Sequence, residues 1–177
     1  MYQKILVPID GSATSNKGLD EAIRLAQLTG ATLRLVHVVD ELSISMGMMG
    51  YAYSAGTFDG LRAAGADIIE AARSQVAAAG LNVETSLREN VEGPLPDLVL
   101  AEARSWKADL IVLGTHGRRG FRRMVLGSSA ENIVRTATIP VLLVRAPEIA
   151  ESGPAEGEPP THGVLGIDLP AGSVAME

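Results

Sequence analysis

Short apolar runs alternate along the chain with longer stretches in which apolar residues recur at helical spacing. The run from Leu110 to Leu113 is the clearest short one, and its unbroken apolar character favours a strand buried on both faces. Similar runs predict further strands at about residues 4–9, 32–39, 82–88 and 141–145. The intervals between these runs leave room for one connecting element between each pair of consecutive strands.

The connecting stretches have the spacing of amphipathic helices. We predict helices at about residues 15–29, 61–79, 94–106 and 129–136. In the second helix one apolar stripe is formed by Leu61, Ala64, Ile68, Ala72, Val76 and Ala79. Gly30 and Gly80 follow the first two helices and suit helix C-termini. Because strands and helices alternate, we expect an α/β fold: a five-stranded parallel sheet, doubly wound, with right-handed crossovers and helices on both faces.

Two segments break this alternation. Residues 41–60 mix methionine and aromatic side chains with glycine, which fits either an apolar lid or partner-facing flap, or a simple cover for the edge of the sheet. Residues 146–177 contain 10 Pro or Gly and no Lys or Arg, which is typical of a disordered acidic tail. Within this tail, residues 164–169 are apolar enough to dock on a neighbouring surface. The sequence therefore predicts one domain, 1–145, followed by an acidic Pro/Gly-rich tail, 146–177.

The net charge of −6 is unevenly distributed. Residues 1–145 carry all 15 Lys and Arg and 15 of the 21 acidic residues, so the excess acids lie in the tail. A neutral domain with an acidic tail lacks the basic surface that nucleic-acid binding needs. The absence of cysteine excludes disulfides and thiolate chemistry. The first residues lack the layout of a signal peptide and no apolar run is long enough to span a membrane, so we expect a cytoplasmic protein without membrane contact.

A glycine-rich loop follows the strand predicted at 110–113. It begins with Gly114-Thr115-His116-Gly117 and, nine residues later, continues with Gly127-Ser128-Ser129. Ser128 and Glu131 have the spacing of a capping box, which predicts that a helix starts at Ser128 or Ser129. This order favours phosphate binding, because the first-turn amides of a helix lack internal partners and carry the positive end of its dipole.

The loop differs from two common phosphate-binding motifs. No lysine follows Gly127, so it is not the loop of P-loop ATPases, and it is not the dinucleotide motif G-x-G-x-x-G. Four arginines gather inside the loop: Arg118, Arg119, Arg122 and Arg123. The last three fit either phosphate contacts or a solvated loop face.

The spacing Gly-x2-Gly-x9-Gly-Ser, formed by Gly114, Gly117, Gly127 and Ser128, resembles the nucleotide-binding signature of the universal stress protein family. The resemblance extends to Val-Pro-Ile-Asp-Gly-Ser at 7–12 and Pro-Val-Leu-Leu-Val at 140–144, and it covers residues 1–145. It implies the strand order 3-2-1-4-5, which places the loops at Asp10 and Gly114 side by side where the crossovers reverse direction.

The resemblance to the ATP-binding type of this family also implies a set of site residues. Those expected around the ribose and phosphates are Gly114, Gly117, Gly127, Ser128 and Ser129, with Thr115, His116 and Arg118 in the same loop. Those expected near the adenine and ribose are Pro8, Asp10 and Val38.

Two polar residues keep alternative interpretations. Asp10 is a poor phosphate ligand because its carboxylate repels the anion, so it either accepts from a base or ribose group, holds a divalent ion, or only shapes the start of the following helix. His116 fits a proton donor, a metal ligand or a phosphate partner. His37, inside the second strand, is interpreted as structural. We assign no residue as catalytic and none as a metal ligand.

The function expected from these features is binding of ATP, with Mg²⁺ held through the phosphates, by a stress-response sensor or regulatory protein. The resemblance also implies a homodimer, paired through the apolar fifth strand at Val141–Val144. The enzymatic alternative is an ATPase. Its turnover is expected to be slow, because the sequence shows no arranged general base and no P-loop lysine. The remaining alternatives are binding of AMP or cyclic AMP, and a scaffold that reaches a protein partner through residues 41–60 or the tail.

Overall fold

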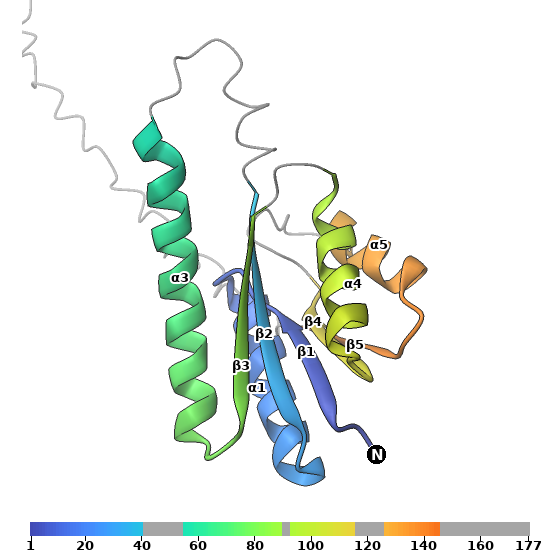
Figure 1. Ribbon diagram of the computed structural model, residues 1–177. Coiled ribbons are helices and arrows are strands. Elements are labelled where there is room, and N and C mark those ends of the chain that lie inside the picture. Colours follow the sequence, from blue (N-terminus) through green and yellow to red (C-terminus); the bar gives the residue numbers. More distant parts are fainter. Residues whose placement is uncertain (41–54, 90–92, 116–125, 146–177) are drawn as a thin grey trace, which may run out of the picture. The chain divides into compact units, whose positions relative to one another are not determined.

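The computed structural model describes residues 1–40, 55–89, 93–115 and 126–145. Their helices and strands belong to one unit, Met1–Pro147 (Figure 1). In chain order they are β1 (Lys4–Pro8), α1 (Ala13–Thr29), β2 (Thr32–Val39), α3 (Ala55–Ala78), β3 (Val83–Glu89), α4 (Leu95–Trp106), β4 (Leu110–Gly114), α5 (Ser128–Thr136) and β5 (Val141–Val144).

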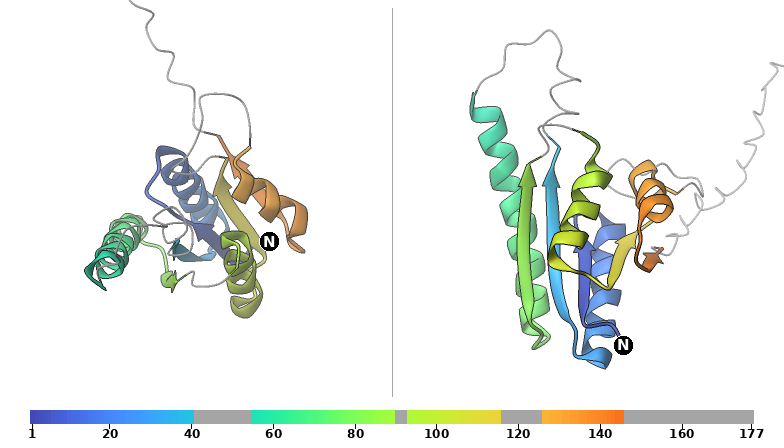
Figure 2. Two further views of the ribbon diagram at one scale, coloured as in Figure 1. Left: turned by 90° about the horizontal axis from the view of Figure 1, so that it is seen from above. Right: turned by 45° about the vertical axis from the view of Figure 1, so that its right-hand side comes forward.

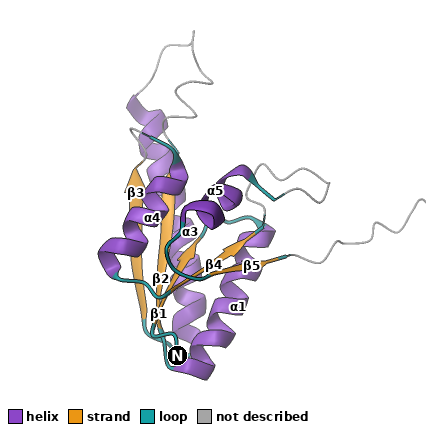
Figure 3. Ribbon diagram, turned by 90° about the vertical axis from the view of Figure 1, so that its right-hand side faces the viewer, coloured by secondary structure: helices purple, strands orange, loops and turns teal. Residues whose placement is uncertain are grey.

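The strands form one five-stranded sheet in the order β3-β2-β1-β4-β5. Every neighbouring pair is parallel, and the central strand β1 aligns Ile5 with Leu33 of β2 on one side and with Leu110 of β4 on the other. The strands β4 and β5 lie next to each other at one end of the sheet (Figure 3). This arrangement confirms the predicted doubly wound fold and its strand order.

Side chains alternate between two apolar cores, one on each face of the sheet. In β1, Ile5 and Val7 face α1 and α3, whereas Leu6 faces α4 and α5. In β4, Val112 faces the first pair of helices and Ile111 the second. Seen from above, α1 and α3 therefore lie on one side of the sheet, and α4 and α5 on the other (Figure 2, left). Burial on both faces explains why the central strands are continuous apolar runs.

Helix α1 begins two residues earlier than the apolar spacing indicated, at Ala13. Ser12 caps it, because its side-chain oxygen accepts from the Ser15 backbone N–H at 3.2 Å. At the other end Gly30 adopts the left-handed conformation with φ of 73°, as the predicted C-terminus requires. Gly18 lies within the helix and faces the backbone of β4, so this face packs closely on the sheet.

Helix α3 corrects two expectations. It begins at Ala55, so residues 55–60 are helical and only the rest of the segment 41–60 lies outside the described residues. Ala64 is exposed, whereas Gly65 is buried against β2 and lies on the buried face of the helix together with Ile69. Glycine gives no periodic apolar signal and alanine occurs on both faces of this helix, so only packing reveals where the helix starts and which small residues it buries.

Candidate functional site

The sheet changes its winding direction between β1 and β4. From β1 the chain crosses through α1 to β2 on one side, and from β4 it crosses through α5 to β5 on the other. The carboxyl ends of these two central strands are the place where doubly wound α/β proteins bind ligands. The loop after β1 and the loop after β4 therefore begin at the same edge of the sheet, although about a hundred residues separate them in the chain.

Asp10 shapes the turn that follows β1. Its Oδ1 accepts from the Ser12 backbone N–H at 2.9 Å, and its own backbone N–H donates to Ser15 Oγ at 3.1 Å. The side chain that caps α1 is Ser12 and not Asp10. The carboxylate of Asp10 is half-buried and held at the carboxyl end of β1, two residues before that cap.

Pro8 and Val38 share the α4 and α5 face of the sheet. Pro8 aligns with Val36 in the β1–β2 register, and Val36 belongs to the core on that face. Val38 follows two residues later in β2 and packs against the same core. Both residues are partly buried, so together they offer an apolar surface at the carboxyl ends of two neighbouring strands.

Gly114 packs against the first turn of α1. A Cβ atom at this position would lie 2.6 Å from the Thr14 carbonyl oxygen and 3.0 Å from the Ser15 nitrogen. Real Cβ atoms do not approach a backbone this closely, so the contact between β4 and α1 is sufficient reason for glycine at this site. The glycine serves the assembly of the sheet edge whether or not a ligand is bound.

Thr115 links the end of β4 to two other elements. Its N–H donates to the Val144 carbonyl of β5 at 3.0 Å, and its carbonyl accepts from the Gly127 N–H at 2.9 Å. Thr115 is buried, so these bonds form away from solvent. They fix the N-terminal end of α5 at the carboxyl edge of the sheet.

The predicted capping box at α5 is wrong. The N-cap is Gly127, with φ of −59° and ψ of 142°, and Ser128 is already the first helical residue. The bond from Gly127 to Thr115 sets this register, and the Glu131 N–H then donates to the Gly127 carbonyl at 2.8 Å. No side-chain hydrogen bond caps this helix. The N–H groups of Ser128 and Ser129, in the first turn, therefore receive no acceptor from the cap residue.

The predicted site residues are only partly described. Pro8, Asp10, Val38, Gly114, Thr115, Gly127, Ser128 and Ser129 lie at the carboxyl ends of β1, β2 and β4 or at the start of α5. His116, Gly117 and Arg118 lie outside the described residues. Two further residues, Ser15 and His37, contact the peptide that joins Ile9 to Asp10, and no motif in the sequence indicated that contact.

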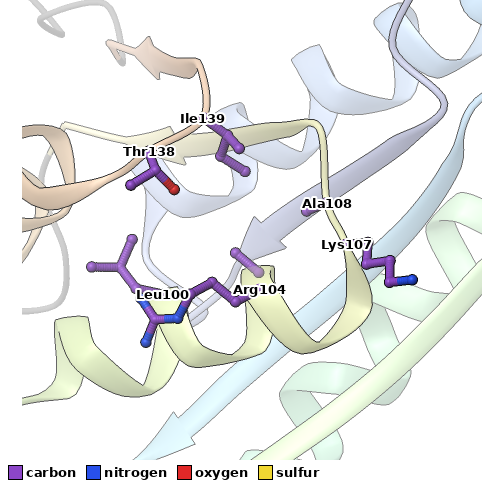
Figure 4. Close-up of a pocket in the computed structure, with 7 residues that line it drawn as sticks. Leu100, Arg104, Lys107, Ala108, Thr138 and Ile139 are labelled. Carbon is purple, nitrogen blue, oxygen red and sulfur yellow. The ribbon is translucent and has the colours of Figure 1, made fainter.

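A separate hollow of about 70 Å³ lies at the opposite edge of the sheet. It is lined by Leu100, Ala103, Arg104, Lys107, Ala108, Thr138 and Ile139 (Figure 4). Ala108 precedes β4 and Ile139 precedes β5, so the hollow lies at the amino ends of these strands. It contains none of the predicted site residues and is not part of the candidate site.

The described part of the chain offers no ready-made metal centre, because no group of three or more His, Asp or Glu side chains gathers there. Among the helices of these residues, none combines the length and apolar character needed to cross a bilayer.

A parallel sheet in the order β3-β2-β1-β4-β5, with a helix N-terminus anchored beside the β1–β4 junction, places the protein among the doubly wound α/β proteins. A family model described as "Universal stress protein family" matches residues 1–145. The chain thus belongs to the universal stress protein family.

Individual relatives agree with this assignment. The universal stress protein MJ0531 of Methanocaldococcus jannaschii is 32% identical over 148 residues, covering 84% of this chain and 85% of the relative. The solved structure of the hypothetical protein MJ0577 from the same organism has a TM-score of 0.71 at 25% identity, covering 82% of this chain and 97% of that one. A universal stress protein solved in complex with cAMP has a TM-score of 0.59 at 27% identity, covering 81% and 97% of the two chains.

Proposed function

We propose that this protein binds an adenine nucleotide at the carboxyl edge of its sheet and acts as a regulatory protein in a stress response. The phosphates lie at the N-terminus of α5, near Gly127, Ser128 and Ser129. The adenine and ribose lie toward the ends of β1 and β2, near Pro8, Asp10 and Val38. His116, Gly117 and Arg118 complete the phosphate side of the site.

The observation that carries this proposal is the N-terminus of α5. Its cap residue is a glycine without a side chain, and the Gly127–Thr115 hydrogen bond of 2.9 Å holds it at the winding reversal of the sheet. The first-turn amides and the helix dipole favour an anion at this position. In contrast, the N-terminus of α1 is capped by its own Ser12, so α5 is the better phosphate site of the two.

The relative solved with cAMP supports adenine as the base, because that protein shares the fold and 27% of its residues with this chain. We propose ATP as the ligand, with Mg²⁺ held through the phosphate oxygens. The complex of the relative makes cAMP the second candidate ligand. AMP uses the same contacts without the outer phosphates.

Assembly is a further part of the proposal. The edge strand β5 leaves Leu142 36% exposed, and an exposed apolar edge favours pairing with another strand. We propose that two copies pair through Val141–Val144. As part of the same proposal the protein acts in the cytoplasm, where adenine nucleotides are abundant. A protein partner binds to residues 41–60 or to the tail.

Mass spectrometry of nucleotide released from freshly purified protein tests the proposal. We expect ATP, and calorimetry on nucleotide-free protein is expected to show Mg²⁺-ATP binding more tightly than AMP. Release of cAMP, with tighter calorimetric binding of cAMP than of ATP, would select the second candidate. The proposal would be refuted if the protein is purified without bound nucleotide and binds none of the three nucleotides in calorimetry.

A further inference from the structure

The peptide unit between Ile9 and Asp10 is held from both sides by side chains of two other elements. Its carbonyl oxygen lies 2.7 Å from His37 Nδ1 of β2, and its N–H donates to Ser15 Oγ of α1 at 3.1 Å. A carbonyl oxygen only accepts, so His37 Nδ1 carries the proton and donates it. His37 is 6% exposed and Ser15 is 5% exposed, so both bonds form inside the protein.

The two side chains are themselves held in place. On one side, Gly65 of α3 lies so close that a Cβ atom there would be 2.8 Å from His37 Cδ2, which leaves the imidazole little room to turn. On the other side, the Ser15 N–H donates to Ser12 Oγ, and Gly114 packs against the same turn. The peptide therefore lies between α3 and β2 on one side and α1 and β4 on the other.

This peptide stands where the chain leaves the sheet. The aligned residues of β1 and β2 end with Pro8 and Val36, and the last backbone bond there is from the Ile9 N–H to the Val36 carbonyl at 2.9 Å. Beyond it, the plane of the Ile9–Asp10 peptide sets the direction in which the Asp10 side chain leaves the backbone. The bond from the Ser12 N–H to Asp10 Oδ1 then orients the carboxylate.

We infer that His37 and Ser15 are positioning residues for Asp10 in the nucleotide site. They hold the Ile9–Asp10 peptide so that the carboxylate meets the base or ribose in a fixed orientation, and they do not touch the nucleotide themselves. This inference rests on the proposed function. It also connects α3 to the site, since Gly65 of that helix confines His37.

A double-mutant cycle tests the inference by calorimetry with Mg²⁺-ATP and with cAMP. His37→Leu removes the ring N–H that donates to the Ile9 carbonyl, and Ser15→Ala removes the hydroxyl that accepts from the Asp10 N–H. Asp10→Ala removes the side chain that both residues position. We expect each of the first two substitutions to lower the affinity about tenfold in the wild-type background, the effect of losing about one hydrogen bond. In the Asp10→Ala background we expect neither to lower it further.

Two variants control for general damage to the fold. His37→Asn keeps an N–H donor near the position of Nδ1 and is expected to restore most of the affinity that His37→Leu loses. Leu35→Ala removes a fully buried side chain of β2 on the same face, two residues earlier. It is expected to lower the melting temperature and leave the affinity within about twofold. The inference is overturned if His37→Leu loses as much affinity without Asp10 as with it, or if His37→Leu binds like the wild type.

Amide hydrogen exchange on the nucleotide-free protein separates this inference from the proposed function. We expect the Asp10 N–H to exchange about tenfold faster in His37→Leu and in Ser15→Ala than in the wild type, because the peptide is then held from one side only. If the wild type binds nucleotide but the Asp10 N–H of both variants exchanges at the wild-type rate, the positioning role alone is overturned. A wild type that binds no adenine nucleotide would refute the proposed function, whatever the exchange rates.

Discussion

Glu102 of α4 and Arg34 of β2 form an ion pair beneath the surface, with Glu102 Oε1 and Arg34 Nη1 2.9 Å apart. Arg88 of β3 contacts the other carboxylate oxygen, with its Nε 2.8 Å from Oε2. Glu102 is 2% exposed, and the Arg34 guanidinium lies 4.7 Å from the centre of the Trp106 ring one turn further along α4. Where α4 covers β2 and β3, a charged network therefore joins the layers, while apolar contacts join them over β1 and β4.

Removing the carboxylate of Glu102 is expected to destabilise the fold. Arg34 and Arg88 contact different oxygens of Glu102, and Glu102→Gln removes the negative charge and turns one of these acceptors into an NH2 donor that faces a guanidinium. Breaking a buried pair costs about 3 to 5 kcal/mol. Because Arg88 is half exposed, we expect a smaller loss of about 2 to 3 kcal/mol in urea unfolding. The matched control is Glu70→Gln, which removes a carboxylate paired with Arg73 on the surface of α3 and is expected to change nothing measurable. Equal effects of the two variants would contradict this account.

The same carboxylate makes stability depend on acid pH. Burial raises the pKa of Glu102, but the hydrogen bonds from Arg88 and Arg34 together lower it more, so the net pKa is below its ordinary value. A carboxylate with a lowered pKa stabilises the folded state fully above the unfolded pKa of about 4.3, and this contribution is lost as the pH falls through the folded value. Unfolding of the wild type should become easier between about pH 5 and pH 3, and Glu102→Gln should show a weaker dependence over that range. Parallel pH curves for the two proteins would rule out Glu102 as a source.

Gly114→Ala tests the packing role of the first glycine in the loop. The added Cβ would meet the Thr14 carbonyl at 2.6 Å, and backbone cannot give way as a flexible side chain can. We expect the nucleotide-free protein to lose about 1 to 3 kcal/mol of stability, as in other overpacked sites. Gly60→Ala in α3 is the control, because a Cβ there meets nothing within 4 Å and alanine favours a helix by up to about 1 kcal/mol. Full stability of Gly114→Ala would leave only a ligand-based reason for glycine.

Gly127→Glu tests the phosphate site at α5. The φ of −59° is open to any residue, and an acid at a helix N-terminus is favourable by about 0.3 to 1 kcal/mol. The melting temperature of the nucleotide-free protein should therefore change little. The new carboxylate repels phosphate, so calorimetry should detect no ATP binding. Gly127→Ser, which adds no charge, is the control and should keep most of the affinity. Normal ATP binding by Gly127→Glu would contradict a phosphate site at the N-terminus of α5.

Leu142→Lys tests assembly through β5. A lysine on an edge strand opposes pairing with a second strand, so light scattering should show a dimer for the wild type and a monomer for the variant. Leu28→Lys is the matched control, because Leu28 on α1 is 78% exposed and lies away from the sheet edge. A dimer that survives Leu142→Lys and dissociates in Leu28→Lys would place the interface elsewhere.

Much of the fold was predictable because its signals are local. Each strand buried on both faces gives an unbroken apolar run such as 110–113, and Gly30 ends a helix through its own backbone conformation. The start of α3 was missed, since residues 55–60 include two glycines and only one large apolar side chain, Phe58, which is too little to show a helical period. The cap of α5 was misplaced by one residue, because a bond from Gly127 to a distant strand selects the cap, and not the Ser128 side chain.

The sequence by itself determined the alternation of strands and helices, the two-sided burial of the central strands and the glycine-rich loop after β4. These features depend on residues close together in the chain, and the strand order followed from resemblance to a family with the same motifs. Only the tertiary structure decided why Gly114 must lack a side chain, what His37 and Ser15 hold, and which cations face Glu102. The contacts of Gly114, His37 and Glu102 join different elements of the fold, and the bond between Ser15 and Asp10, although only five residues apart, depends on how the turn after β1 folds. The spacing of residues along the chain does not show which of these groups will meet.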